Sequence, residues 1–163
     1  MNRPTYEFEQ QANPNVYTFT SVGVNGEIKK AVIISRIESI SDDPNAQFYN
    51  LAFGDLADAT DYSTCNDDVR SNNGDMPKIL ATVVKVTMEF LTKNRTATLM
   101  FSGLIDEKSR LLGRNQRNIL YHRAIDSNWF ELSLLLEVYG INGMDVEEYR
   151  PGVQYETVLL RRK

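Results

Sequence analysis

The sequence is poor in the residues that build disulfides, metal centres and catalytic triads. It has one cysteine, Cys65, and one histidine, His122, among 163 residues. A single cysteine forms no intrachain disulfide, and a single histidine leaves no histidine-rich metal site and one base at most for a serine triad. We therefore expect no metal and no cofactor, and we interpret Cys65 as an incidental thiol in a reducing compartment.

Long apolar runs and leader sequences are also missing. No stretch of 18 apolar residues occurs, and residues 1–7 lack the apolar core of a secretory signal. These absences predict a cytoplasmic protein that makes no membrane contact. With only 5 prolines and 9 glycines, 42% hydrophobic and 25% charged residues, the chain has the composition of a globular protein. Its length suits one domain over residues 1–163.

The sequence motifs of several large enzyme classes are absent. There is no Gly-x-Ser-x-Gly, no phosphate-binding P-loop and no dinucleotide fingerprint. The net charge is −4, but residues 76–125 carry 9 basic and 3 acidic groups, a local charge of +6. An acidic chain argues against nucleic-acid binding, whereas a basic segment within it suits a phosphate group on a smaller ligand.

Alternation of apolar and polar residues predicts most of the sheet. We expect short strands at 6–8, 17–19, 27–37, 47–53, 96–102, 129–138 and 155–160. Asn25-Gly26 is typical of a tight turn, because both residues tolerate positive φ, and joins two of these strands in a hairpin. The strand at 129–138 has an alternative, since Asn128 followed by Glu131 is also typical of a helix N-terminus.

Two helices complete the expected fold. Asp75 as N-cap and Pro77 in the first turn begin an amphipathic helix of about five turns. A second helix is expected at 107–125. Together these elements predict an α+β fold: a mostly antiparallel twisted sheet of about six or seven strands, with two helices packed on one face.

A polar segment from Asp55 to Asp75 is expected to be a long loop. It carries six aspartates, whose oxygens are ligands that Mg²⁺ and Ca²⁺ prefer. The spacing does not match the calcium-loop pattern. We therefore favour a solvated loop that is held by local side-chain turns and ends in a helix cap.

A basic stripe on the second expected helix is the first candidate ligand site. Arg110, Arg114, Arg117 and Tyr121 follow one another at i, i+4, i+7 and i+11, which places them on one helix face. Guanidinium groups so close together suit a phosphate-bearing ligand or a protein partner, with Tyr121 stacking or hydrogen-bonding beside them. The alternative is a solvated face paired with carboxylates of the sheet.

Part of this stripe carries a resemblance to an enzyme family. Arg110-x-x-Gly113-x-Asn115 partly resembles the pyrophosphate loop of acetyltransferases related to the histone enzymes. The resemblance implies a coenzyme A or nucleotide substrate bound at a helix N-terminus. Asn115 stands where that family has a small residue.

A second resemblance covers nearly the whole chain. Residues 49–55 (YNLAFGD), 71–75 (SNNGD) and 78–83 (KILATV) resemble motifs of an uncharacterised family of small bacterial single-domain proteins. The family implies no activity. Its two loop motifs meet at the start of the first helix, which gives a second candidate site for an anion: Asp55, Asn73, Asp75 and Lys78. The alternative is that these residues serve turns and a cap.

Three functions follow from these patterns. The first is a cytosolic binding or regulatory module that recognises a protein partner or a phosphate-bearing ligand through the basic stripe. The second is an enzyme acting on a nucleotide or coenzyme A-type substrate, with Asp55 and Asp75 as acid, base or Mg²⁺ groups. The third, a nucleic-acid binder, is opposed by the net charge. The oligomeric state is left open by the sequence.

Overall fold

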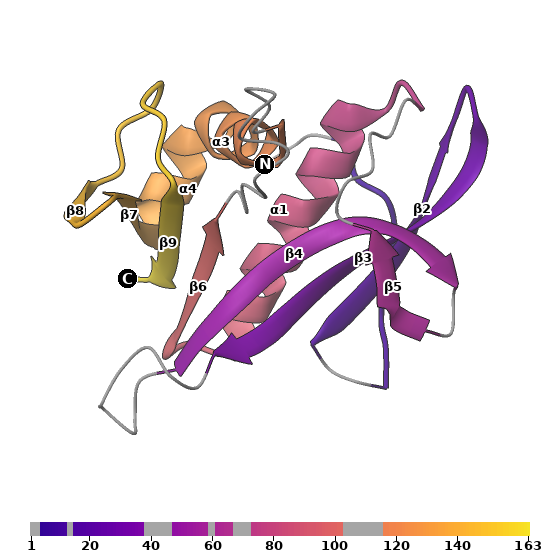
Figure 1. Ribbon diagram of the computed structural model, residues 1–163, viewed down its shortest axis with the longest axis horizontal. Helices are drawn as coiled ribbons and strands as arrows, with labels where there is room; N and C mark the ends of the chain where they lie inside the picture. The colour runs from indigo at the N-terminus through magenta and orange to yellow at the C-terminus, as the bar shows by residue number, and fades with distance from the viewer. Residues whose placement is uncertain (1–3, 13–14, 38–46, 59–60, 67–72, 103–115) are drawn as a thin grey trace. The chain divides into compact units, whose positions relative to one another are not determined.

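The computed structural model describes residues 4–12, 15–37, 47–58, 61–66, 73–102 and 116–163, with the backbone alone at 55–58, 61–66, 102 and 116–120 (Figure 1). This part of the chain holds nine strands and three helices. The α+β class is therefore confirmed. The expected numbers were too small, because the structure adds short strands and a third helix that the sequence pattern did not reveal.

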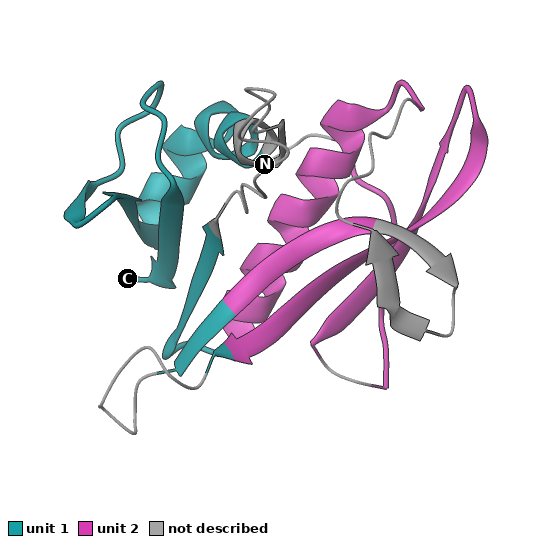
Figure 2. Ribbon diagram, in the orientation of Figure 1, with its two compact units in different colours: residues 1, 37–49, 94–163 teal, residues 2–36, 50–93 magenta. Residues whose placement is uncertain are grey.

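The fold consists of two compact units (Figure 2). Unit 1 comprises residues 37–49 and 94–163 with residue 1, and unit 2 comprises residues 2–36 and 50–93. Each unit is described below by itself.

Unit 2 is a layer of strands with one long helix. Its strand order is β1-β2-β3-β4, with β5 also paired to β4, and the pairs β1–β2, β2–β3 and β4–β5 are antiparallel. The elements are β1 (Glu9–Gln10), β2 (Val16–Gly23), β3 (Gly26–Ile37), β4 (Gln47–Asp58), β5 (Asp61–Asn66) and α1 (Met76–Lys93). The strand expected at residues 6–8 is wrong, since β1 begins at Glu9.

The predicted hairpin and first helix are confirmed. β2 and β3 pair up to Gly23 opposite Gly26, and Gly26 adopts a φ of 83° that favours glycine. α1 begins directly after Asp75, and ten of its side chains are buried in the pattern of an amphipathic helix, from Ile79 to Leu91.

The loop expected from Asp55 to Asp75 is wrong in its first half. β4 continues to Asp58, and the chain returns as β5, which pairs Asp55 with Asn66 and Leu56 with Cys65. The polar side chains hid this hairpin, because backbone pairing in a strand does not require apolar residues. Residues 67–72 lie outside the described part of the chain.

Unit 1 contains a four-stranded antiparallel sheet and two helices. The order is β6-β9-β7-β8, formed by β6 (Ala97–Ser102), β7 (Leu136–Asn142), β8 (Asp145–Glu148) and β9 (Thr157–Arg162). The helices are α3 (Gln116–Ser127) and α4 (Trp129–Leu135). Leu99, Phe101, Val158 and Leu160 are among the buried side chains of this sheet. α3 ends two residues beyond the expected helix, whose first part lies outside the described residues.

The strand expected at 129–138 is wrong in its first seven residues. The Asn128 carbonyl accepts the Leu132 N–H at 2.9 Å, which begins α4, and β7 follows only from Leu136. Glu131 in the first turn is favourable at the positive end of the helix dipole. The apolar residues that suggested one buried strand face are divided in the helix. Leu132 is buried, whereas Phe130 and Leu134 are exposed. No helix in the described ranges is both long enough and apolar enough to cross a membrane.

Candidate functional site

The N-terminus of α1 brings three of the predicted site residues together in unit 2. The Asp75 carbonyl accepts the N–H groups of Lys78 at 2.9 Å and Ile79 at 3.0 Å, so the residue occupies the expected cap position. Its carboxylate serves other partners: Oδ2 accepts the Tyr6 hydroxyl at 2.5 Å and also the Ser21 hydroxyl. Asp75 thus connects the N-terminal segment and β2 to the start of α1.

Asn73 fills the turn between β2 and β3. Its side chain is 2% exposed. Asn73 Oδ1 accepts the Asn25 N–H at 2.6 Å, and its Nδ2 donates to Ser21 Oγ and to the Gly26 carbonyl, both at 3.0 Å. The Asn73 carbonyl accepts the Val24 N–H at 3.2 Å. These bonds hold the hairpin turn against the residues that precede α1.

Lys78 completes the described part of this site. Its Nζ lies 4.2 Å from the centroid of the Tyr6 ring, within the range of a cation–π contact. The Tyr6 N–H donates to Thr82 Oγ1 at 2.9 Å, one turn along α1. Asp55 lies in β4, but its side chain is outside the described residues. Its pairing with Asp75 as catalytic carboxylates, and an anion site here, stay predictions.

The environment of Asp75 sets its charge state. Burial acts to raise the pKa of this carboxyl, but the hydrogen bonds from Ser21 and Tyr6 and the nearby charge of Lys30 outweigh it, so the pKa lies below its ordinary value of 3.8. A carboxylate whose folded-state pKa is lowered stabilises the fold above its unfolded-state pKa. That contribution is lost as the pH falls through the folded-state pKa.

We expect Asp75→Asn to lower the free energy of unfolding of unit 2 by about 1–2 kcal/mol at pH 7, because it replaces the charged, half-buried acceptor of two hydrogen bonds by a neutral amide. Urea denaturation followed by hydrogen exchange in α1 measures the loss. The difference between variant and wild type should shrink as the pH falls below about 3.8. A gap that is constant from pH 7 to pH 3 would contradict a role for the charge.

The basic stripe is described only at its C-terminal end. Arg110 and Arg114 lie outside the described residues, and the side chain of Arg117 in α3 is outside them too. Tyr121 is 3% exposed, and its ring centroid lies 4.5 Å from that of Phe101 on β6. Tyr121 is thus used in the core of unit 1 rather than at the surface. A ligand site at the three arginines stays a prediction.

Next to Tyr121, sequence reasoning missed a buried cluster around His122, the only histidine. The Tyr155 N–H donates to His122 Nε2 at 2.9 Å across 33 residues, and the Tyr155 ring stacks on the imidazole with centroids 6.1 Å apart. Because a backbone N–H can only donate, Nε2 must accept, so the imidazole carries its proton on Nδ1. His122 is thereby fixed in one tautomer in the interior of unit 1, 2% exposed.

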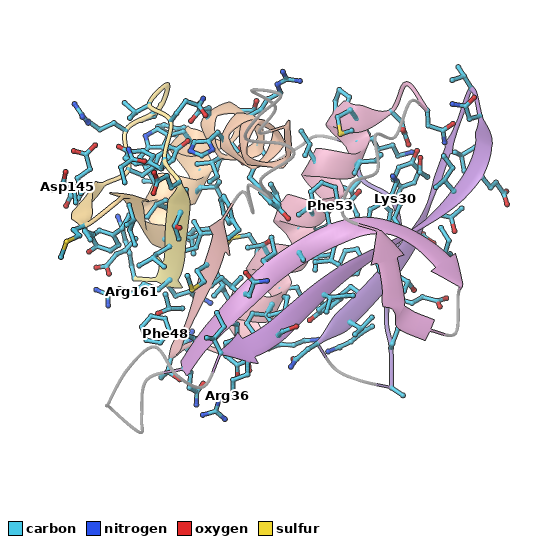
Figure 3. The ribbon with its side chains drawn as sticks, viewed as in Figure 1. Lys30, Arg36, Phe48, Phe53, Asp145 and Arg161 are labelled. Atoms are coloured by element: carbon cyan, nitrogen blue, oxygen red, sulfur yellow. The ribbon has the colours of Figure 1, made fainter. Side chains whose placement is uncertain are left out.

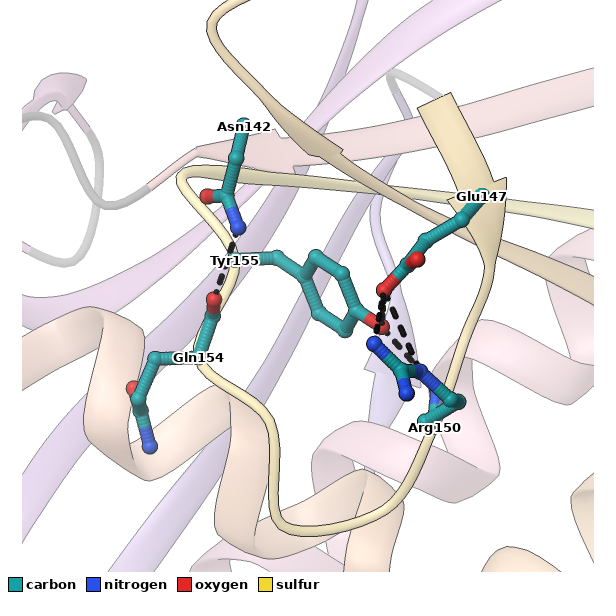
Figure 4. Close-up of polar contacts among 5 residues, drawn as sticks. All are labelled: Asn142, Glu147, Arg150, Gln154 and Tyr155. Atoms are coloured by element: carbon teal, nitrogen blue, oxygen red, sulfur yellow. Dashed lines mark hydrogen bonds and ion pairs between the residues drawn. The ribbon is translucent and has the colours of Figure 1, made fainter. Parts of the chain in front are cut away.

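Two tyrosine–carboxylate pairs flank this histidine. The Tyr149 hydroxyl donates to Asp126 Oδ1 at 2.7 Å, and burial, with Asp126 beside it, raises the pKa of that phenol far above its ordinary value. The Tyr155 hydroxyl donates to Glu147 Oε1 at 2.6 Å, which also accepts from Arg150 Nη2 at 3.0 Å (Figure 4). The bonds from Tyr155 and Arg150 lower the pKa of Glu147. These pairs fasten the 149–155 loop to α3 and β8.

The family of the chain follows from a match along almost its whole length. One family model covers residues 2–163, and so spans both units. The chain belongs to the family of unknown function DUF6934. The expectation of an uncharacterised family is therefore confirmed. No curated protein and no solved structure matches the chain.

In this DUF6934 member, exposed apolar side chains gather in unit 1. Of the seven large apolar side chains that are exposed in the described residues, five belong to unit 1. Three lie on α4 and two at the β7–β8 hairpin: Phe130, Leu134, Leu135, Met144 and Val146. Sequence reasoning missed them because it placed residues 129–138 in a strand with one side against the core.

Proposed function

We propose that this DUF6934 member is a protein-binding module of the bacterial cytoplasm that acts as one module over residues 1–163. Its partner docks on the α4 apolar face, the name used here for Phe130, Leu134 and Leu135. The observation that carries this proposal is the exposure of these side chains, 79% for Phe130 and 63% for Leu134. Contiguous apolar patches on a protein surface mark interaction sites, whereas single exposed side chains do not.

The spacing of the α4 apolar face suits a docking site. Phe130 and Leu134 are four residues apart, so they lie one turn apart on the same side of the helix. Burial of such a side chain against a partner gains about 1.5–3 kcal/mol. Two such side chains on one helix side are suited to be the anchors of an interface, because a few anchors supply most of the affinity there.

The helix that presents these side chains is held firmly. Leu132 within the helix and Leu136 directly after it are buried, and the Asn128 side chain donates to the Ala124 carbonyl at 2.8 Å. At the other end, the Lys163 N–H donates to the Leu135 carbonyl at 3.1 Å. A preorganised helix loses little freedom when a partner binds, which favours affinity.

The alternative function is an enzyme acting on a nucleotide or coenzyme A-type substrate, with Asp55 and Asp75 as acid, base or Mg²⁺ groups and a substrate loop at residues 110–115. Residues 110–115 lie outside the described part of the chain. That alternative stays a prediction from the sequence, and so does binding of a phosphate-bearing ligand at the basic stripe, which Arg114→Glu should weaken without unfolding the protein.

We expect Phe130→Asp and Leu134→Asp each to reduce the recovery of a specific partner at least tenfold, because a charge replaces an apolar anchor. The measurement is quantitative cross-linking of the intact chain in lysate of its host, followed by titration calorimetry with the purified partner. The matched control is Val24→Asp, which introduces the same charge at an 82% exposed side chain of unit 2. Equal recovery with all three variants would refute the proposed docking face.

A further inference from the structure

The outer edge of β8 is the second feature of unit 1 that is open to a partner. β8 ends the strand order of its sheet and pairs, among the described residues, with β7 alone. All four of its residues are exposed. An edge strand presents a row of backbone N–H and C=O groups on which another chain can form a further strand.

The register of β7 and β8 shows which groups face outward. Asp145 is paired with Asn142 and Glu147 with Gly140, and the Tyr149 N–H donates to the Val138 carbonyl at 2.9 Å. In an antiparallel pair, hydrogen-bonded and non-hydrogen-bonded residues alternate. The N–H and C=O groups of Val146 and Glu148 therefore point away from β7, and no described residue pairs with them there.

The side chains along this edge are acidic with one aliphatic member. Three of the four β8 residues are acidic, and Figure 3 shows Asp145 on the outer side of the strand. Glu147 is already bonded to Tyr155 and Arg150, which leaves Asp145 and Glu148 as the β8 carboxylates without a partner among the described residues. Val146, 61% exposed, lies beside its register partner Ile141 on one face of the sheet.

We infer that β8 binds an extended, lysine- or arginine-rich segment of a partner protein as a fifth strand of the unit 1 sheet. This inference rests on the proposed protein-binding function and names the chemistry of the segment. Charge complementarity with Asp145 and Glu148 selects a basic segment, because opposite charges across adjacent strands are stabilising and like charges are not. The same rule disfavours a second copy of β8, which would place carboxylates beside carboxylates.

The geometry also sets the order of side chains in the bound segment. Side chains of an added strand that stand opposite Val146 and Glu148 share the face of those two residues. The segment therefore carries an aliphatic residue opposite Val146 and a basic residue opposite Glu148. Basic residues also flank Asp145 on the other face.

The probe is a seven-residue peptide with one central valine between two runs of three lysines, capped at both ends and carrying a fluorophore, with binding followed by anisotropy. We expect saturable binding to the full chain. Two changes to the peptide should each abolish this binding. The first is N-methylation of every second residue, chosen so that the methylated N–H groups are those that would bond β8. The second is replacement of every lysine by glutamate. Equal binding of the N-methylated peptide would overturn the inference, because contact by charge alone does not need backbone N–H groups. Failure of the unmodified peptide to bind would overturn it as well.

Two variants of the chain localise the contact. Val146→Pro removes an outward N–H but no β7–β8 ladder bond, and proline is tolerated at such an edge position, so we expect at least a tenfold loss of peptide affinity. Glu148→Lys should weaken binding severalfold and reduce its salt dependence. Glu27→Lys makes the same charge change at an exposed residue of β3 and should leave affinity unchanged. Unchanged affinity in Val146→Pro would place the peptide elsewhere.

The two proposals fail in distinguishable ways. Phe130→Asp should not affect peptide binding, since it lies on α4 rather than on β8. If the peptide does not bind while recovery of the natural partner still depends on Phe130, the added strand is refuted and the docking face stands. If the peptide binds as expected and partner recovery is unaffected by Phe130→Asp, the docking face is refuted and the added strand stands.

Discussion

Replacing Gly140 by alanine is expected to unfold unit 1 at a far lower urea concentration than the wild type requires. A Cβ atom at Gly140 would lie 2.2 Å from Cδ1 and 2.3 Å from Cε1 of the Tyr155 ring. Such distances do not occur between carbon atoms in contact, so the ring or the β7 backbone must move. Gly140 is thus required by a close approach and not by an unusual φ.

Tyr155 has little room to give way. Its ring is fully buried, its hydroxyl donates to Glu147 at 2.6 Å, and its N–H donates to His122 at 2.9 Å. Displacement of the ring would lengthen or break both hydrogen bonds, and each buried donor left without an acceptor costs about 1–3 kcal/mol. Together with the overpacking itself, we expect a loss of roughly 3 kcal/mol or more.

The single tryptophan gives a direct measurement of this loss. The Trp129 ring centroid lies 5.2 Å from that of Tyr149, in the same aromatic cluster, so its fluorescence reports unfolding of unit 1. Gly143→Ala is the matched control: its Cβ meets nothing within 4 Å, and its φ of 59° costs an alanine only about 1–2 kcal/mol. A Gly140→Ala variant as stable as Gly143→Ala would contradict the packing described here.

A double variant tests whether the clash is the cause. Tyr155→Leu removes the ring that Gly140 accommodates. If the clash is responsible, Gly140→Ala should cost much less in the Tyr155→Leu background than in the wild type. Additive losses would mean that Gly140→Ala destabilises unit 1 through the β7 backbone instead.

The parts of the fold that the sequence predicted are those with strong local signals. α1 combines a cap, a proline in its first turn and a long apolar stripe, and all three lie within the 18-residue helix and the residue before it. The β2–β3 hairpin follows from one turn and two runs of strand-forming residues. Neither element depends on a distant partner for its pattern to be recognisable.

The elements that sequence reasoning missed carry conflicting or distant signals. Residues 129–135 alternate like a strand, yet Asn128 and Glu131 are typical of a helix start, and the helix is what forms. In α3, the basic residues predicted a surface stripe that included Tyr121, whereas Tyr121, Ala124 and Ile125 are buried at helical spacing and form a core stripe.

The candidate site was predictable only in part for the same reason. Asn73, Asp75 and Lys78 are neighbours in the chain, so their meeting at the α1 N-terminus follows from the helix start alone. Their partners Tyr6 and Ser21 lie 69 and 54 residues from Asp75, and no sequence period connects them. The bond between Tyr155 and His122 is equally distant, so a lone histidine gave no sign that it was part of a cluster.

The close approach of β2 to the start of α1 leads to the second large expected effect, that of Gly23→Ala on unit 2. A Cβ atom at Gly23 would lie 2.0 Å from the Asn73 carbonyl oxygen and 2.9 Å from its carbonyl carbon. A backbone cannot turn aside as a flexible side chain can. Asn73 must therefore be displaced, together with the residues that lead into α1.

The displacement should be costly because Asn73 is bonded on every side. It accepts from Val24 and Asn25 and donates to Ser21 and Gly26, and each such bond is worth about 1 kcal/mol. We expect Gly23→Ala to lower the free energy of unfolding of unit 2 by roughly 3 kcal/mol or more. Gly26→Ala, with a φ of 83° and nothing within 4 Å of its Cβ, should cost about 1–2 kcal/mol.

Hydrogen exchange measures the two variants at the place where they act. In Gly23→Ala, the N–H groups of Val24 and Asn25 lose acceptors on Asn73, so both should exchange faster than in the wild type. In Gly26→Ala the clash with Asn73 is absent, so the N–H groups of Val24 and Asn25 should keep most of their protection from exchange. The relative loss of unfolding free energy in the two variants decides the physical cause. If close packing against Asn73 is responsible, Gly23→Ala loses more stability than Gly26→Ala. If Gly26→Ala were the worse, the φ of the turn would limit the hairpin, and the close contact with Asn73 would be wrong.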